Sequence, residues 1–204
     1  MDHEVSAADA FASPGGSGVD GNGRPSQING NGRASHGPSP FPDRLARLYT
    51  EQLADIRSAE RQAAEVFPEM AIVAADEMVA SVFRAAASET EIQLARLDGL
   101  LESLRLTPDD VGATPLDGFL SEARLILDGE FEGEGRDLDD RLLRSARHSL
   151  RYQVAGYESA CSTARRLGDY RTLDILLLSL DEELATDSTL SQMVARRSRI
   201  LRAI

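Results

Sequence analysis

The sequence predicts an all-α protein, a four-helix bundle whose long crossover carries a short fifth helix. Four long segments repeat apolar residues at three- and four-residue steps, which is the pattern of one helix face. The composition is 42% hydrophobic but only 5% aromatic, with no Trp. Leu, Ala, Val and Ile must therefore fill the core, and this composition favours helix over sheet.

The first part of the chain differs from the rest. Residues 1–40 are rich in Gly, Ser, Asn and Pro, with few large apolar groups. Ordering such a segment would cost more entropy than burial could return. We expect a disordered tail over residues 1–40 and a helical bundle over 41–204. The tail is either a solvated spacer or a segment that binds a protein partner.

The spacing of apolar residues places five helices in order. They cover residues from 42 to about 70, 76–104, 116–127, 137–167 and 170–197. Pro68 should kink the first helix or mark a break in it. Short links join the first helix to the second and the third long helix to the fourth, so each pair should form an antiparallel hairpin. The longer middle connection can run the length of the bundle, as in two hairpins joined by one crossover.

Carboxylates and amides interrupt the apolar faces of these helices. The interrupting residues are Glu60, Glu89, Gln93, Gln153, Glu183 and Asp187. Carboxylates are rarely buried unless they are paired or bound to a cation. Several of them in one core would take up protons, gather arginines or hold a metal. Hard cations such as ferrous iron or manganese match oxygen ligands from facing helices.

Each of these residues also has a simpler interpretation. Glu60 could lie at the rim of the bundle. Glu183 and Asp187 could form a helix-end or surface pair neutralised by Arg147 or Arg151. Gln93 and Gln153 are of a residue type that more often makes hydrogen bonds in a core than binds a metal.

Several segments together resemble a known family. They are LY at 48–49 with SAERQ at 58–62, SET at 88–90 with Gln93 and RL at 96–97, LDGFLSEA at 116–123, Tyr152 with AGY at 155–157, and LDEE at 180–183 with TD at 186–187. Their order and spacing resemble the YciE/YciF-type proteins, a bacterial stress-associated branch of the ferritin-like superfamily. The resemblance implies a dimeric ferritin-like subunit with a dinuclear metal site inside the bundle.

Carried over residue by residue, the resemblance makes Glu60, Glu89, Glu183 and Asp187 candidate metal ligands. Gln93 stands where family members often have His or Gln.

The third long helix departs from the family pattern. Relatives typically have Glu at two positions there, and this sequence has Leu150 and Gln153. His148 lies two residues from the Leu150 position and should point elsewhere. Losing a bridging carboxylate should weaken the site severely, since even changes around the ligands typically cost about 10–100-fold in affinity. We expect an incomplete site that binds iron or manganese weakly, or else a metal-free scaffold for dimerisation and partner binding. The resemblance also implies ferroxidase-type activity, and the missing carboxylates of the third long helix should lower it.

The net charge and the cysteine content indicate which kinds of partner and which cellular compartment to expect. A formal net charge of -12 should repel nucleic acid and anionic membranes, so we expect neither as a partner. The single cysteine, Cys161, excludes an internal disulfide, fits a reducing cytosol and suits a small core position. No leader and no apolar run of roughly 18 residues is visible. We therefore expect a cytoplasmic protein and, from the resemblance, a homodimer.

Overall fold

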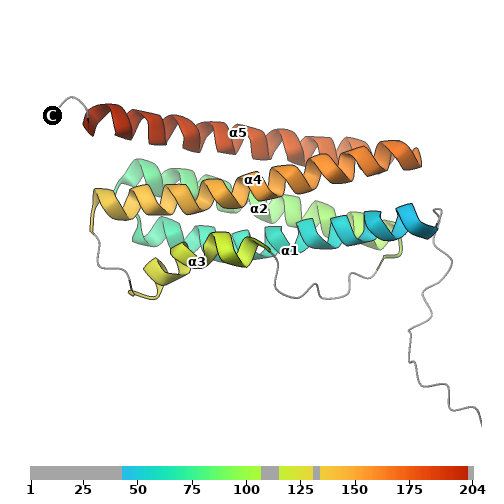
Figure 1. The fold of residues 1–204 in the computed structure, drawn as a ribbon, viewed down its shortest axis with the longest axis horizontal. Coiled ribbons are helices and arrows are strands. Elements are labelled where there is room, and N and C mark those ends of the chain that lie inside the picture. The colour runs from blue at the N-terminus through green and yellow to red at the C-terminus, as the bar shows by residue number, and fades with distance from the viewer. Residues whose placement is uncertain (1–42, 107–114, 131–133, 202–204) are drawn as a thin grey trace, which may run out of the picture. The chain divides into compact units, whose positions relative to one another are not determined.

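Helices make up almost all of the described part of the chain (Figure 1). The computed structural model describes residues 43–106, 115–130 and 134–201. Its helices are α1 (Asp43–Val73), α2 (Glu77–Ser103), α3 (Pro115–Leu127), α4 (Arg136–Leu167) and α5 (Tyr170–Leu201). The predicted all-α class is confirmed, and these ranges contain no strand. The expected tail over residues 1–40 lies outside the described residues.

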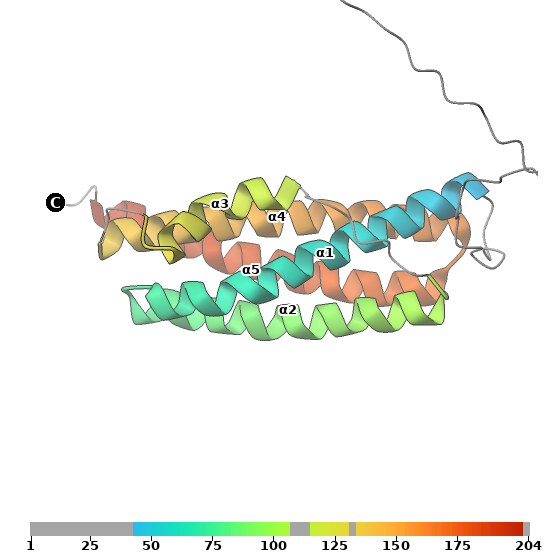
Figure 2. The same ribbon diagram turned by 90° about the horizontal axis from the view of Figure 1, so that it is seen from below.

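The four long helices surround one interior. α1 packs against α2 and α4, and α5 packs against α4 and α2. Figure 1 shows α2 and α4 running in the same direction, so the connection between them returns along the bundle. α3 belongs to this connection and packs on α4 and α1 (Figure 2). The structure therefore has the predicted arrangement of two hairpins, a crossover and a short fifth helix.

Local chemistry accounts for the helix ends. Asp76 caps α2, because its carboxylate accepts a hydrogen bond from the Met78 N–H at 2.8 Å. Gly168 ends α4 at φ 71°, a left-handed conformation that strains any residue with a side chain.

Pro68 does not interrupt the first helix. α1 continues through it to Val73, so the predicted alternative of a break is wrong. Proline removes one backbone hydrogen bond. Phe67 and Met70 on either side of it are almost completely buried, and their packing keeps the helix intact.

A buried aspartate fixes one end of the bundle. Asp139 of α4 is 1% exposed, and its carboxylate accepts hydrogen bonds from the backbone N–H groups of Ala75 (2.8 Å) and Asp76 (3.2 Å). Arg197 of α5 forms ion pairs with Asp139 (3.3 Å) and Asp76 (3.2 Å). This network ties the α1–α2 turn to α4 and α5, and sequence patterns did not indicate it.

The interior contains two apolar clusters. One includes Phe67, Phe83 and Leu150, and the other includes Leu53, Leu97 and Leu176. The first lies toward the α1–α2 turn, and the second toward the turn between α4 and α5. Along every long helix, buried polar residues fall between the two clusters, and they form the candidate site.

Candidate functional site

Each long helix contributes one almost completely buried carboxyl or amide side chain near the middle of the bundle. The residues are Glu60 on α1, Gln93 on α2, Gln153 on α4 and Glu183 on α5, none more than 2% exposed. We call these four residues the polar layer. The prediction that Glu60 and Glu183 point inward is confirmed, and the rim and surface alternatives for these two residues are wrong.

Glu60 receives hydrogen bonds from α4 on both oxygens. Gln153 Nε2 donates to Oε2 at 2.9 Å, and the Tyr157 hydroxyl donates to Oε1 at 2.8 Å. Ser149 in turn donates to Gln153 Oε1 at 3.1 Å. Burial raises the pKa of Glu60 from 4.5 to about 8, although the bonds from Tyr157 and Gln153 act in the opposite direction. Glu60 therefore holds a proton at neutral pH when no cation is bound.

Glu183 is less well satisfied than Glu60. Burial raises its pKa well above the ordinary value, and the negative charges of Glu60 and Glu89 raise it further. Among the described residues, its Oε2 atom is buried without a hydrogen-bond partner, and so is Gln93 Oε1. Gln93 Nε2 lies 3.3 Å from Glu182 Oε2 and 3.5 Å from the Ser179 carbonyl oxygen. Two buried oxygen acceptors in the layer are thus open to a proton or a cation.

The other two predicted ligands lie at or beyond the edge of the polar layer. Glu89 is half-buried and accepts a hydrogen bond from Thr186 Oγ1 at 2.7 Å. Asp187 is half-buried and accepts from Arg147 Nε at 3.2 Å, with Arg151 Nε at 3.8 Å from the same oxygen. The alternative of neutralisation by these arginines therefore holds for Asp187, although not for Glu183.

The third long helix offers amide and hydroxyl groups to the layer. Leu150 is 1% exposed and belongs to an apolar cluster, while His148 is exposed on the outside of α4, as expected. Within the described ranges, no three His, Cys, Asp or Glu side chains are arranged so that they could hold a metal ion. The residues that come nearest to a cation site are Glu183 and Gln93, each with one buried oxygen that lacks a donor among the described residues, and Glu60 and Glu89 are bonded to other groups. These residues do not fit a dinuclear centre, because α4 contributes no carboxylate to the polar layer.

Some partners of the layer were not predicted. Tyr157 lies one helical turn after Gln153, and Thr186 lies nearly one turn after Glu183, so helix spacing could have indicated both. Arg96 pairs with Glu182 at the edge of the layer, with Nη2 3.0 Å from Oε1. No sequence pattern links those two residues, which belong to different helices.

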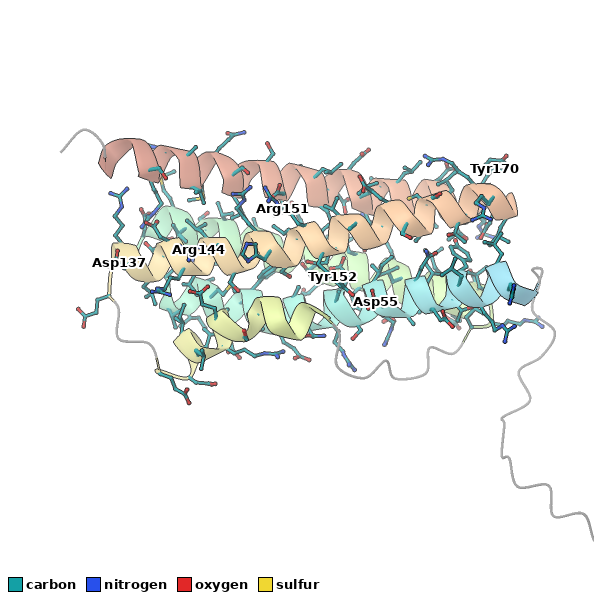
Figure 3. The ribbon with its side chains drawn as sticks, viewed as in Figure 1. Asp55, Asp137, Arg144, Arg151, Tyr152 and Tyr170 are labelled. Atoms are coloured by element: carbon teal, nitrogen blue, oxygen red, sulfur yellow. The ribbon has the colours of Figure 1, made fainter. Side chains whose placement is uncertain are left out.

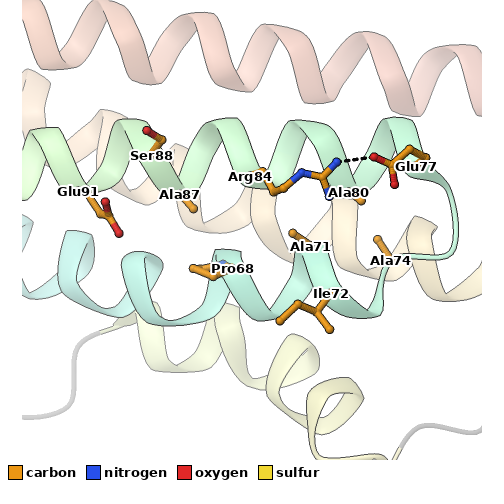
Figure 4. Close-up of a pocket in the computed structure, with 10 residues that line it drawn as sticks. All are labelled: Pro68, Ala71, Ile72, Ala74, Glu77, Ala80, Arg84, Ala87, Ser88 and Glu91. Carbon is orange, nitrogen blue, oxygen red and sulfur yellow. Dashed lines mark hydrogen bonds and ion pairs between the residues drawn. The ribbon is translucent and has the colours of Figure 1, made fainter.

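Other features lie away from the polar layer. The Tyr152 hydroxyl donates to Asp55 Oδ2 at 2.6 Å between α4 and α1 (Figure 3). A surface groove of about 660 Å³ lies between α1 and α2 near their turn, and the Glu77–Arg84 ion pair lines it (Figure 4). Its other lining residues include Pro68 and Ile72, and none belongs to the polar layer.

The fold and the layer define the class of protein, a ferritin-like helical bundle with a buried acidic centre. The chain belongs to the family described as "Domain of unknown function (DUF892)", whose family model matches residues 44–200.

A similar relative confirms the resemblance to the YciE/YciF-type proteins, and two solved structures share the fold. Protein YciF of Escherichia coli (strain K12) is 27% identical over 147 residues, which cover 72% of this chain and 87% of YciF. The crystal structure of that E. coli stress protein superposes with a TM-score of 0.71 at 24% identity, over 78% of this chain and 99% of YciF. YcfI, described as a putative structural protein from Rhodopseudomonas palustris, superposes with a TM-score of 0.66 at 27% identity, over 74% and 98% of the two chains.

Proposed function

We propose that this YciF-like bundle binds one divalent cation, iron or manganese, in exchange for the protons of its polar layer. The observation that supports the proposal is the burial of Glu60 and Glu183 in one interior. Among the described residues neither carboxylate has an arginine or lysine partner, and the charges that act on Glu183 are those of other glutamates. Such a pair must be neutralised by protons or by a cation.

Four residues of this chain would hold the cation, namely Glu183, Glu60, Gln93 and Glu89, once the side chains of Glu60 and Glu89 turn toward it from the positions that they have in the structure. The ion would supply the positive charge that the two buried carboxylates lack. Glu183 Oε2 and Gln93 Oε1 are open, whereas Glu60 and Glu89 must first release hydrogen bonds from α4 and from Thr186. This competition predicts weak binding, and Leu150 leaves a second ion without a carboxylate from α4.

Metal stoichiometry tests the proposal. Chelator-treated protein is titrated with Mn²⁺, or anaerobically with Fe²⁺, by calorimetry in buffers of different ionisation enthalpy. We expect one ion per chain, with the release of protons on binding. The variant Glu60→Gln/Glu183→Gln should lose binding, whereas Glu65→Gln/Asp181→Asn, which changes two exposed acids on the same helices, should retain it. Two ions per chain, or unchanged binding by the Glu60/Glu183 variant, would refute the proposed site.

The second candidate function is a metal-free scaffold for dimerisation and partner binding. It is supported by the hydrogen bonds of Gln153 and Tyr157, which satisfy Glu60 without a metal. A chain that binds neither ion in the titration above would favour this function. Homodimerisation and a cytoplasmic location stay predictions, and light scattering of the purified protein tests the first. No described helix is long and apolar enough to cross a bilayer.

A further inference from the structure

We propose that a groove between α4 and α5 binds a soluble phosphate compound. The groove has a volume of about 280 Å³ and is lined by Asp140, Arg144, Arg147, His148, Arg151, Val194 and Ser198. It lies outside the polar layer, and its proposed ligand is an anion. The inference is therefore independent of the proposed cation site.

The basic residues of the groove share one face of α4. Arg144, Arg147, His148 and Arg151 follow each other at intervals of three, one and three residues, which brings them to the same side of a helix. Figure 3 shows Arg144 and Arg151 along α4, with Arg151 on the side toward α5. Like charges at this spacing repel and destabilise a helix. A site for an anion explains why they are gathered there in a chain whose net charge is -12.

The acidic groups beside the groove do not neutralise it. Arg147 and Arg151 share a single oxygen of Asp187, which they approach through Nε. The carboxylate of Asp140 is bonded to Arg197 and lies 4.0 Å from Arg136 Nε, so other arginines already occupy it. Within the described part of the chain Arg144 forms no ion pair. Three guanidinium groups thus line the groove together with one carboxylate, Asp140, which is bonded to Arg197, while Arg147 and Arg151 share the neighbouring Asp187.

Asp187 also orients one of these arginines. The Arg147 side chain is 20% exposed, and its bond to Asp187 through Nε leaves its outer N–H groups for another acceptor. A planar guanidinium presents paired donors that match the oxygens of a phosphate. The volume of the groove, about 280 Å³, is just below the range of roughly 300–1,000 Å³ for sites of drug-sized ligands, which fits one or two phosphate groups better than a protein segment.

Pyrophosphate is the test probe. Calorimetric titration of the full-length protein should give saturable binding to one site per chain. Arg144 and Arg151 are exposed, so Arg144→Gln/Arg151→Gln should fold normally, and we expect it to bind pyrophosphate at least tenfold more weakly. The control Arg84→Gln/Arg171→Gln removes two exposed arginines elsewhere and should bind as the wild type does.

Three outcomes would overturn the inference. The first is no saturable binding of pyrophosphate at concentrations up to about 10 mM. The second is equal binding by the wild type and the Arg144/Arg151 variant. The third is arginine-dependent binding of a poly-aspartate peptide but not of pyrophosphate, which would make the groove a protein-docking surface instead.

Discussion

Replacing Glu60 by glutamine should stabilise the metal-free protein at neutral pH. The glutamate is 0% exposed, and burial raises its pKa from 4.5 to about 8. At pH 7 the unfolded chain holds an ionised Glu60, whereas the folded chain holds a protonated one. Folding must therefore take up a proton, and this uptake lowers stability as the pH rises from 4.5 toward 8. Glutamine ionises in neither state and removes this cost.

The size of the effect follows from the shift in pKa. Each pH unit between 4.5 and 7 lowers the free energy of unfolding of the wild type by about 1.4 kcal/mol. Glu60→Gln should therefore be more stable than the wild type by up to about 3 kcal/mol at pH 7, and equally stable near pH 4.5. The new amide can keep the layer bonded. The oxygen of the new glutamine accepts a hydrogen bond from Tyr157. When the Gln153 amide turns over, the Gln153 oxygen accepts from the new NH₂ group and the Gln153 nitrogen donates to Ser149.

Urea unfolding of chelator-treated protein measures this effect. The free energy of unfolding is determined for the wild type and for Glu60→Gln at several pH values from about 5 to 8. The wild type should lose a few kcal/mol more than the variant across this range. Glu65→Gln changes an exposed acid of the same helix and should follow the wild type. Curves for the wild type and Glu60→Gln that run parallel would show that Glu60 does not fold in its protonated form.

Two further predictions concern the framework of the bundle. Asp139→Ala should lower the free energy of unfolding by about 2–4 kcal/mol, because Ala75, Asp76 and Arg197 lose a buried acceptor; the exposed Asp137→Ala should change it little in the same urea assay. Gly156→Ala would place a Cβ atom 3.0 Å from Ile56 Cγ1 where α4 approaches α1, whereas Gly99→Ala meets nothing within 4 Å. In thermal unfolding we expect Gly156→Ala to lower the free energy of unfolding by about 1 kcal/mol. Gly99→Ala should raise it by about 0.5–1 kcal/mol, because alanine has the higher helix propensity. Equal changes in the two variants would contradict this prediction.

Much of the fold could be predicted from periodicity. The helix stripes placed Glu60, Gln93, Gln153 and Glu183 on inward faces, and the structure buries all four. Periodicity did not separate Glu183 from Asp187, because residues four apart share a face of one helix. Arg147 and Arg151 come from a different helix, and only their approach to Asp187 distinguishes the two acids.

The sequence by itself determined the helices, their order and the acidic character of the interior, because these depend on spacing along one chain. The tertiary structure decided which polar groups meet across helices. It joined Tyr157 and Gln153 to Glu60, left Glu183 Oε2 without a donor, and turned Asp187 toward arginines. The physical reason is that hydrogen bonds and ion pairs between helices depend on contacts of a few ångströms. Helix packing sets such distances, and hydrophobic periodicity does not encode them.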